Sequence, residues 1–270
     1  MSGRPRAARI AFPLALGLAT AVVVLFLTLP VVAIFVDTGP GRLLDSLGDP
    51  GALDALWLSA KTTAAALALI LVFGTPAAYL LATRRFRGRD AIVTLVELPL
   101  VLPPAVAGIA LLAAVGPSGV LGGALADAGL ELTLQTAGVV VALTFVASPF
   151  YVRQALAAFA AVDRTLIDAS RTLGASEART FARVVVPSAR GGLVAGGALS
   201  LGRALGEFGA TLMFAGSFEG LTQTAPLAIY ARLGTDYDEA LALSAVLVAV
   251  SAGLLLATKL ATRDGDGVRA

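Results

Sequence analysis

The chain has 270 residues, of which 57% are hydrophobic and only 14% are charged, and its mean hydropathy is +0.87. A soluble domain carries about a quarter charged residues, so the composition predicts a membrane protein. The sequence contains no Cys and no His, which excludes a disulfide framework, a thiolate metal site and the usual histidine base.

Six apolar stretches are long enough to cross a bilayer, whose hydrocarbon core of about 30 Å needs about 20 helical residues. They cover approximately 10–36, 55–82, 91–115, 134–159, 191–216 and 238–262. The first is too long for the apolar core of a secretory signal, so we expect a retained span. We therefore expect an all-α membrane protein with one transmembrane domain over 1–270, whose core is 55–262.

Most of the basic residues fall on one side of these spans. They form four groups, before span one, between spans two and three, at or between spans four and five, and after span six: Arg4, Arg6, Arg9; Arg84, Arg85, Arg87, Arg89; Arg153, Arg164, Arg171, Arg179, Arg183, Arg190; Lys259, Arg263, Arg269. The opposite loops are mainly acidic. The positive-inside rule then predicts that both termini and the 163–190 loop are cytoplasmic, in a multi-pass protein of the cell membrane. A soluble helical protein is the alternative, and it leaves this asymmetry without a cause.

The loop between spans four and five contains a patterned, basic segment, 163–187. Asp163 is a residue type that caps helix N-termini, and Gly174 suits the left-handed end of a helix. Small or apolar positions lie between them at helical spacing: Leu166, Ala169 or Ser170, and Leu173. A second stripe has the same spacing: Ala178, Phe181, Ala182 and Val185. We expect two short helices bent at Gly174, with Pro187 breaking the helix before span five. By these residues alone, the pair either docks another protein or lies on lipid headgroups.

The sequence offers no site for ATP. A P-loop needs Lys directly after Gly, and the two lysines, Lys61 and Lys259, follow other residues. We therefore expect no catalytic site, cofactor or metal in this chain, and any ATP chemistry must belong to a partner.

Four charged residues fall at membrane depth, where a charge is costly and marks function by default: Lys61, Glu97, Arg203 and Glu207. Arg203 and Glu207 are four residues apart on one helix and can pair. They either form a structural ion pair or line a translocation path. We expect Lys61 and Glu97 to pair across spans two and three and stabilise the bundle.

Proline and small residues interrupt spans three and five. Pro99, Pro103 and Pro104 remove amide donors from span three, and carbonyls freed at membrane depth must be satisfied by protein or face a wet cavity. We expect a break close to the pathway, with a benign kink as the alternative. Span five carries small residues four apart, which favour close helix approach: Ala198, Gly202, Gly206 and Ala210.

Two stretches resemble the permeases of ABC importers. Asp168-Ala169-Ser170, then Gly174, then Val184-Val185-Val186-Pro187 has the spacing of their cytoplasmic signature, Glu-Ala-Ala, three residues, Gly, nine residues, Ile-x-Leu-Pro. It departs in Asp for Glu, Ser for Ala, and Val for both Ile and Leu. The stretch 203–216 resembles the span-five signature of molybdate permeases, whose relatives carry sulfate, thiosulfate and tungstate. Segments 99–108 and 222–230 also resemble that group.

The resemblance implies a type I ABC-importer permease fold and a homodimeric subunit that translocates molybdate, or alternatively sulfate, thiosulfate or tungstate. Its implied partners are two cytoplasmic ATPases holding ATP and Mg²⁺, an extracytoplasmic oxyanion-binding protein and membrane lipid, without nucleic acid. The implied coupling residues lie in the 163–187 segment: Asp168, Ala169, Ser170, Gly174, Ala175 and Pro187. The pathway candidates are Arg203, Gly206, Glu207, Pro103 and Pro104. A partner-independent anion carrier and a scaffold or sensor without flux are the competing classes.

Overall fold

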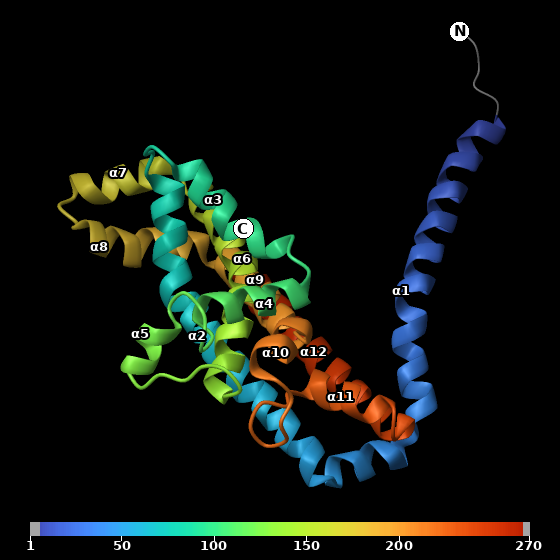
Figure 1. Cartoon of the computed structure of the whole chain (residues 1–270). Coiled ribbons are helices and arrows are strands. Elements are labelled where there is room, and N and C mark those ends of the chain that lie inside the picture. Colours follow the sequence, from blue (N-terminus) through green and yellow to red (C-terminus); the bar gives the residue numbers. More distant parts are fainter. Residues whose placement is uncertain (1–5, 267–270) are drawn as a thin grey trace.

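The protein is a helical bundle in the computed structural model, which describes residues 6–266 apart from the side chains of 6–11, 40, 42–47, 259 and 261–266. Every regular element in this range is a helix (Figure 1). Five helical stretches there are long and apolar enough to cross a membrane: Phe12–Gly39 in α1 (Arg6–Gly48), α2 (Pro50–Thr83), α6 (Thr136–Ala160), Glu177–Leu205, and Tyr237–Thr258 in α12 (Tyr237–Asp266). The charge argument also used Arg4 and Arg269, which lie outside the described residues. For Arg6, Arg9, Lys259 and Arg263 the structure describes the backbone but not the side chain.

The core forms where α6 packs between α2 and α9 (Val186–Leu205). Small residues let α9 approach α6: a Cβ added to Gly192 would lie 2.4 Å from the Ala158 Cβ, and one added to Gly196 would lie 3.0 Å from the Gln154 Cβ. One turn further on, Ser200 donates to the Ala147 carbonyl at 2.9 Å, inside the core. Gly192, Gly196 and Ser200 therefore form the face of α9 that packs on α6. The row of small residues predicted at positions 198, 202, 206 and 210 does not lie on one helix, because α9 ends at Leu205 and α10 begins at Gly209.

The stretch predicted as the third span is broken, as the prolines predict. Its first part is α3 (Arg89–Glu97) with the 3-10 turn η1 (Leu98–Leu100), and its second part is α4 (Pro104–Val115). The two parts are bent by 118°. Pro103 caps α4 in an extended conformation and Pro104 is its first residue, a position where the missing amide breaks no helical bond.

The fifth span differs from the prediction at both ends. The expected stretch 191–216 is divided, because α9 ends at Leu205 and a separate α10 (Gly209–Ala215) follows. At the other end Pro187 does not break the helix: α8 (Glu177–Thr180) continues through the π-helical turn η2 (Phe181–Val185) into α9. In that turn the Val186 amide donates to the Phe181 carbonyl, five residues back. This shift in hydrogen-bond register directly before Pro187 lets the helix continue without the proline amide.

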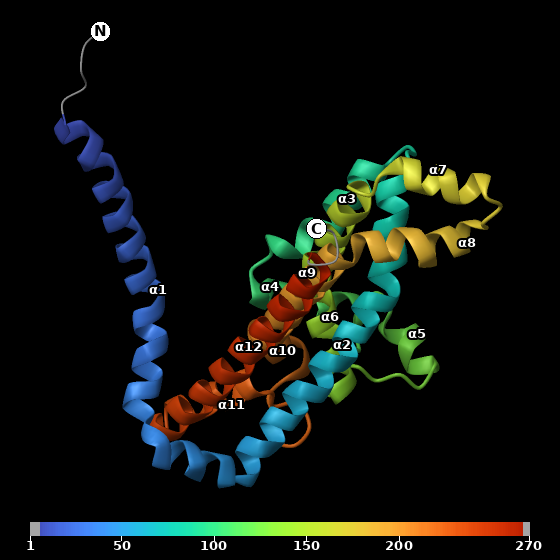
Figure 2. The same cartoon turned by 180° about the vertical axis from the view of Figure 1, so that it is seen from behind.

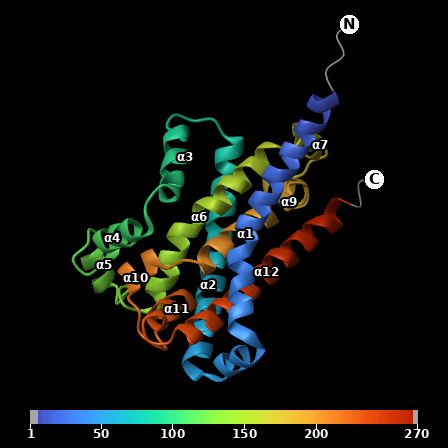
Figure 3. The ribbon, with the colours of Figure 1, turned by 90° about the vertical axis from the view of Figure 1, so that its right-hand side faces the viewer.

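Short elements occupy the two ends of the bundle. α7 (Arg164–Thr172) and α8 project from one end, near the turn that joins α2 to α3 (Figures 1 and 2). At the other end lie α5 (Gly122–Asp127), α10 and α11 (Ala225–Leu233), with the start of α12. α1 packs on α12 and α2 and crosses the face of the bundle turned to the viewer in Figure 3, where α3, α4 and α5 lie at the left edge and α12 at the right.

Candidate functional site: the α7–α8 pair and the break at Glu207

The segment 163–187 begins with two short helices bent at Gly174, as predicted. Asp163 caps α7, accepting the Thr165 N–H at 2.9 Å, and this bond lowers the pKa of the exposed Asp163 carboxyl. Gly174 has φ +81°, a left-handed conformation that side chains with a Cβ rarely adopt. Ser176 then caps α8 by accepting the Arg179 N–H at 3.3 Å. Local sequence therefore determines both helix starts and the bend.

Aromatic side chains fix this pair to the bundle. The Phe181 ring lies 4.7 Å from the Tyr79 ring of α2, measured between centroids, and Tyr79 lies 5.5 Å from Phe159 of α6. Such pairs add about 0.5–1.5 kcal/mol each beyond their burial. The hydroxyls of Ser170 and Thr180 are 3.0 Å apart and join α7 to α8. The pair is thus braced against α2 and α6.

The outer face of α7 exposes its apolar stripe. Leu166 is 50% exposed and Leu173 is 87% exposed, and Ala169 between them is also exposed. Asp168 is exposed on the same helix, whereas Ser170 is half-buried toward α8. Ala175 is half-buried at the bend. Within the described chain this stripe has no covering element, so it is available to a partner.

A cavity of about 280 Å³ lies beneath α7, between the ends of α2 and α6. Arg84 and Arg171 approach the Glu177 carboxylate at 3.4 and 3.5 Å, and Asp168 also lines the space. These contacts are long and exposed, so they contribute little stability.

The break between α9 and α10 is built around a buried carboxylate. Glu207 is 1% exposed; its Oε1 accepts the Ala210 N–H at 2.7 Å, and its Oε2 contacts the guanidinium of Arg203. The first bond satisfies an amide at the start of α10, where no helical carbonyl is available. The predicted Arg203–Glu207 pair is therefore present at the break between α9 and α10. Gly206 at the end of α9 is exposed and has open space around it.

The two breaks contact each other through α4 and α10. A Cβ added to Gly209 would lie 2.8 Å from the Pro104 Cβ, and one added to Gly108 would lie 2.6 Å from the Met213 Cβ. The starts of α4 and α10 are therefore in close contact. The structure thus brings Pro104 next to the break that contains Glu207, which sequence spacing alone did not indicate.

The predicted pairing of Lys61 with Glu97 is wrong. Glu97 lies 3.5 Å from Arg153 of α6, so it joins the broken third span to the core. Lys61 is exposed on α2, and its side chain makes no ion pair or hydrogen bond within the described part of the chain. Arg153 lies inside α6, and its position beside α3 is seen only in the fold.

An ion-pair latch at the opposite end of the bundle was not predicted. Arg232, at the end of α11, donates to Asp49 and to Glu239, each at 2.7 Å. Asp49 also caps α2 by accepting the Ala52 N–H, and Ser59 of α2 accepts the Ala225 N–H at the start of α11. α11 is therefore held to α2 at both of its ends.

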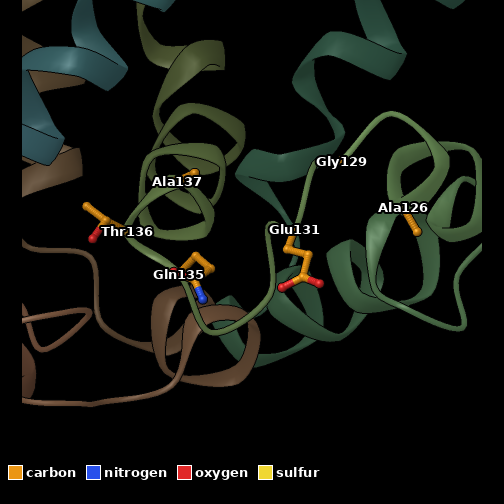
Figure 4. A pocket seen from close by; sticks show the side chains of 6 residues that line it. All are labelled: Ala126, Gly129, Glu131, Gln135, Thr136 and Ala137. Carbon is orange, nitrogen blue, oxygen red and sulfur yellow. The ribbon is translucent and has the colours of Figure 1, made fainter.

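A second cavity, of about 370 Å³, lies at this same end beside the start of α6 (Figure 4). Its lining residues come from α5, the α5–α6 loop and the first turn of α6: Ala126, Gly129, Glu131, Gln135, Thr136 and Ala137. The Glu131 carboxylate would repel an oxyanion, so the lining disfavours anion binding in this cavity.

The sequence matches the family model described as "Binding-protein-dependent transport system inner membrane component" over residues 71–263. The chain belongs to this family. Its members include the membrane permease subunits of ABC transporters, which lack an ATPase domain of their own. This agrees with the absence of a P-loop from the sequence.

Among curated proteins, the chain is 42% identical over 248 residues to the molybdenum transport system permease protein ModB of Mycobacterium tuberculosis, covering 91% of this chain and 93% of that protein. It is 37% identical to the probable transport system permease protein NifC of Clostridium pasteurianum, over 96% and 90% of the two chains. It is 35% identical to the sulfate transport system permease protein CysW of Escherichia coli K12, over 83% and 77%.

Solved structures share the fold at lower identity. A bacterial ABC transporter that imports the acidic polysaccharide alginate matches with a TM-score of 0.73 and 20% identity, over 96% of this chain and 97% of that chain. The MetNI methionine ABC transporter in an inward-facing conformation matches with a TM-score of 0.62 and 21% identity, over 79% and 95%. The fold is that of ABC importer permeases.

Proposed function

We propose that this chain is the membrane-spanning subunit of an ATP-driven importer that carries molybdate across the cell membrane. It has six spans with both termini in the cytoplasm. Two copies form the pathway, two cytoplasmic ATPases hold Mg²⁺ and ATP, and an extracytoplasmic binding protein delivers the anion. The identity to a protein named for molybdenum transport, 42% against 35% for one named for sulfate, supports the choice of cargo.

The α7–α8 pair carries this proposal. It exposes an apolar stripe and the residues Asp168 and Ala169, at the end where Arg84 and Arg171 also lie, and it is braced against α2 and α6. A groove on the ATPase would cover the stripe, and movement of the ATPase would pass through Phe181 into the bundle. Pro187 lies thirteen residues beyond Gly174, inside the continuous helix that joins the α7–α8 pair to the bundle.

The candidate pathway follows the two breaks. Alternating access needs elements that reorient without exposing unpaired backbone to lipid. The break at Gly206 and Glu207 and the break at Pro103 and Pro104 provide such points, and Arg203 adds a positive charge there. Transport in this scheme opens the pathway to each side in turn as the ATPases close and separate.

Reconstitution in proteoliposomes with the ATPase and binding protein tests the proposal. We expect uptake of radioactive molybdate that stops without ATP or without either partner, and that a tenfold excess of sulfate inhibits less than tungstate does. Uptake that continues without ATP and partners would identify a self-sufficient carrier instead. Binding of the partners without any uptake would identify a scaffold.

A further inference from the structure

Lys61 is a charge that the fold leaves without a partner. It is exposed on α2, and its side chain makes no ion pair or hydrogen bond within the described residues. On the same side of α2, the exposed neighbours are Trp57 one turn before Lys61 and three small residues in the two turns after it: Ala64, Ala65 and Ala68. A charged side chain on an apolar span requires an explanation, because exposure to lipid is costly.

The latch at Arg232 indicates the depth of Lys61. Arg232 binds Glu239, and the apolar stretch of α12 begins directly after Glu239, so the latch lies near the membrane boundary. Arg232 also binds Asp49, which precedes α2. Lys61 follows Asp49 by twelve residues of helix, or about 18 Å along the axis. It therefore lies inside α2, more than three turns beyond the N-cap residue.

The carboxylates that the sequence places at membrane depth are already paired with arginines. Glu97 pairs with Arg153, and Glu207 pairs with Arg203. Asp54, on the same helix, lies seven residues before Lys61, about 10 Å along the axis and too distant for an ion pair. A second copy of the chain, related by an axis along the membrane normal, brings the same paired carboxylates at the same depths. No fixed counter-charge then remains for Lys61 among the described residues.

We propose that Lys61 lines the translocation path, where its ammonium group is exposed to water and attracts the oxyanion. This inference rests on the proposed function. The anion is the mobile counter-charge that the protein does not supply, and two copies provide two lysines for a dianion. The exposed alanines in the two turns after Lys61 leave space on that side for the anion and its water.

The absence of Cys from the chain makes this inference directly testable. In the complete complex, we replace Lys61 with Cys and treat it with methanethiosulfonates, which form a disulfide with the thiolate and release methanesulfinate. We expect the charged reagents MTSEA and MTSES to label Lys61→Cys, and 1 mM molybdate to slow labelling at least threefold. Phe26→Cys, on the most apolar helix, is the matched control and should stay unlabelled.

Charge rescue provides the second readout. We expect Lys61→Met and Lys61→Cys to lose at least tenfold in the rate of molybdate uptake, and Lys61→Arg to keep most of it. MTSEA, which adds an ammonium group, should restore uptake by Lys61→Cys, whereas MTSES, which adds a sulfonate, should not. A structural role for the side chain would not distinguish the two reagents.

The experiments on Lys61 can fail independently of the experiment that tests the proposed function. Uptake by the unsubstituted protein tests the cargo, and the ratio of variant to unsubstituted uptake tests Lys61 for whichever anion is carried. Failure of MTSES to label Lys61→Cys in the complex would place the residue against lipid or protein and overturn the inference. Unchanged uptake by Lys61→Met would overturn it equally.

Discussion

Glu207 shows how one residue sets the local backbone. It lies between α9 and α10, almost fully buried, and uses one carboxylate oxygen for the Ala210 amide and the other for Arg203. The order Arg then Glu at i, i+4 is the weaker one on an isolated helix. Here the helix has ended by Glu207, so the pair is determined by the break and by burial.

Replacement of Glu207 by Ala should therefore destabilise the protein strongly. The change leaves the Arg203 guanidinium without its partner and the Ala210 amide without an acceptor, and breaking a buried pair costs about 3–5 kcal/mol. Thermal unfolding of the purified protein in detergent would measure this as a lower melting temperature.

Glu207→Gln is the matched control, because an amide oxygen can still accept the Ala210 N–H. We expect a smaller loss than for Ala. Equal melting temperatures for Glu207→Ala and the unsubstituted protein would show that the carboxylate does not hold the break.

Gly206 and Gly209 flank the same carboxylate but differ in their surroundings. A Cβ on Gly209 would clash with Pro104, at 2.8 Å, whereas the nearest atom to a Cβ on Gly206 is the Gly202 carbonyl oxygen, at 3.7 Å. We expect Gly209→Ala to cost about 1–3 kcal/mol by separating α4 from α10. Gly206→Ala, measured in the same thermal unfolding assay, should be close to neutral, and a reversed order would contradict the observed packing.

At the scale of elements, the α7–α8 pair is the segment that its own sequence specified best. Asp163, Gly174 and Ser176 act through bonds and dihedral angles within a few residues of themselves, so the two helices and the bend follow from local chemistry. Pro187 misled the prediction because a π-helical turn is a rare solution. In the predicted third span, by contrast, three prolines fall within six residues, and there they correctly predicted a break.

Gly174→Trp should uncouple the ATPase from the permease. A Cβ is strained at φ +81°, by about 1–2 kcal/mol, and the large side chain would project into the open space beside the bend. We expect the variant to fold and to reach the membrane, but to lose the ATPase during co-purification and to lose molybdate uptake.

Gly174→Asn is the control for this effect, because Asn tolerates the left-handed region and is small. It should retain the ATPase and most of the uptake. Normal co-purification of the ATPase with Gly174→Trp would count against docking at this bend.

At the scale of the whole molecule, topology joins distant segments into functional units. Arg232 connects the start of α2 to the start of α12, and Phe208 beside Glu207 contacts Tyr230 of α11 with ring centroids 5.0 Å apart. The latch and the break in the fifth span are thus linked through α11. Residues more than 180 apart in sequence meet there, which no spacing rule could indicate.

The proposed topology predicts which loops face the cytoplasm. Ser176→Cys, at the α7–α8 bend, should react with a membrane-impermeant maleimide only after the cells are opened. Glu219→Cys, in the loop before α11, should react on intact cells. The opposite pattern would reverse the orientation, and reaction of both on intact cells would contradict the cytoplasmic placement of the α7–α8 pair.

The sequence by itself determined the features that arise from local or one-dimensional chemistry. Apolar length located four of the spans within a few residues, prolines located the break in the third span, and caps with Gly174 located the α7–α8 pair. Only the tertiary structure decided how the charges pair: Glu97 with Arg153, Arg232 with Asp49 and Glu239, and Lys61 with no described residue. The physical reason is that helix length and capping depend on neighbours in sequence. Ion pairing depends on which helix faces become adjacent when the bundle closes.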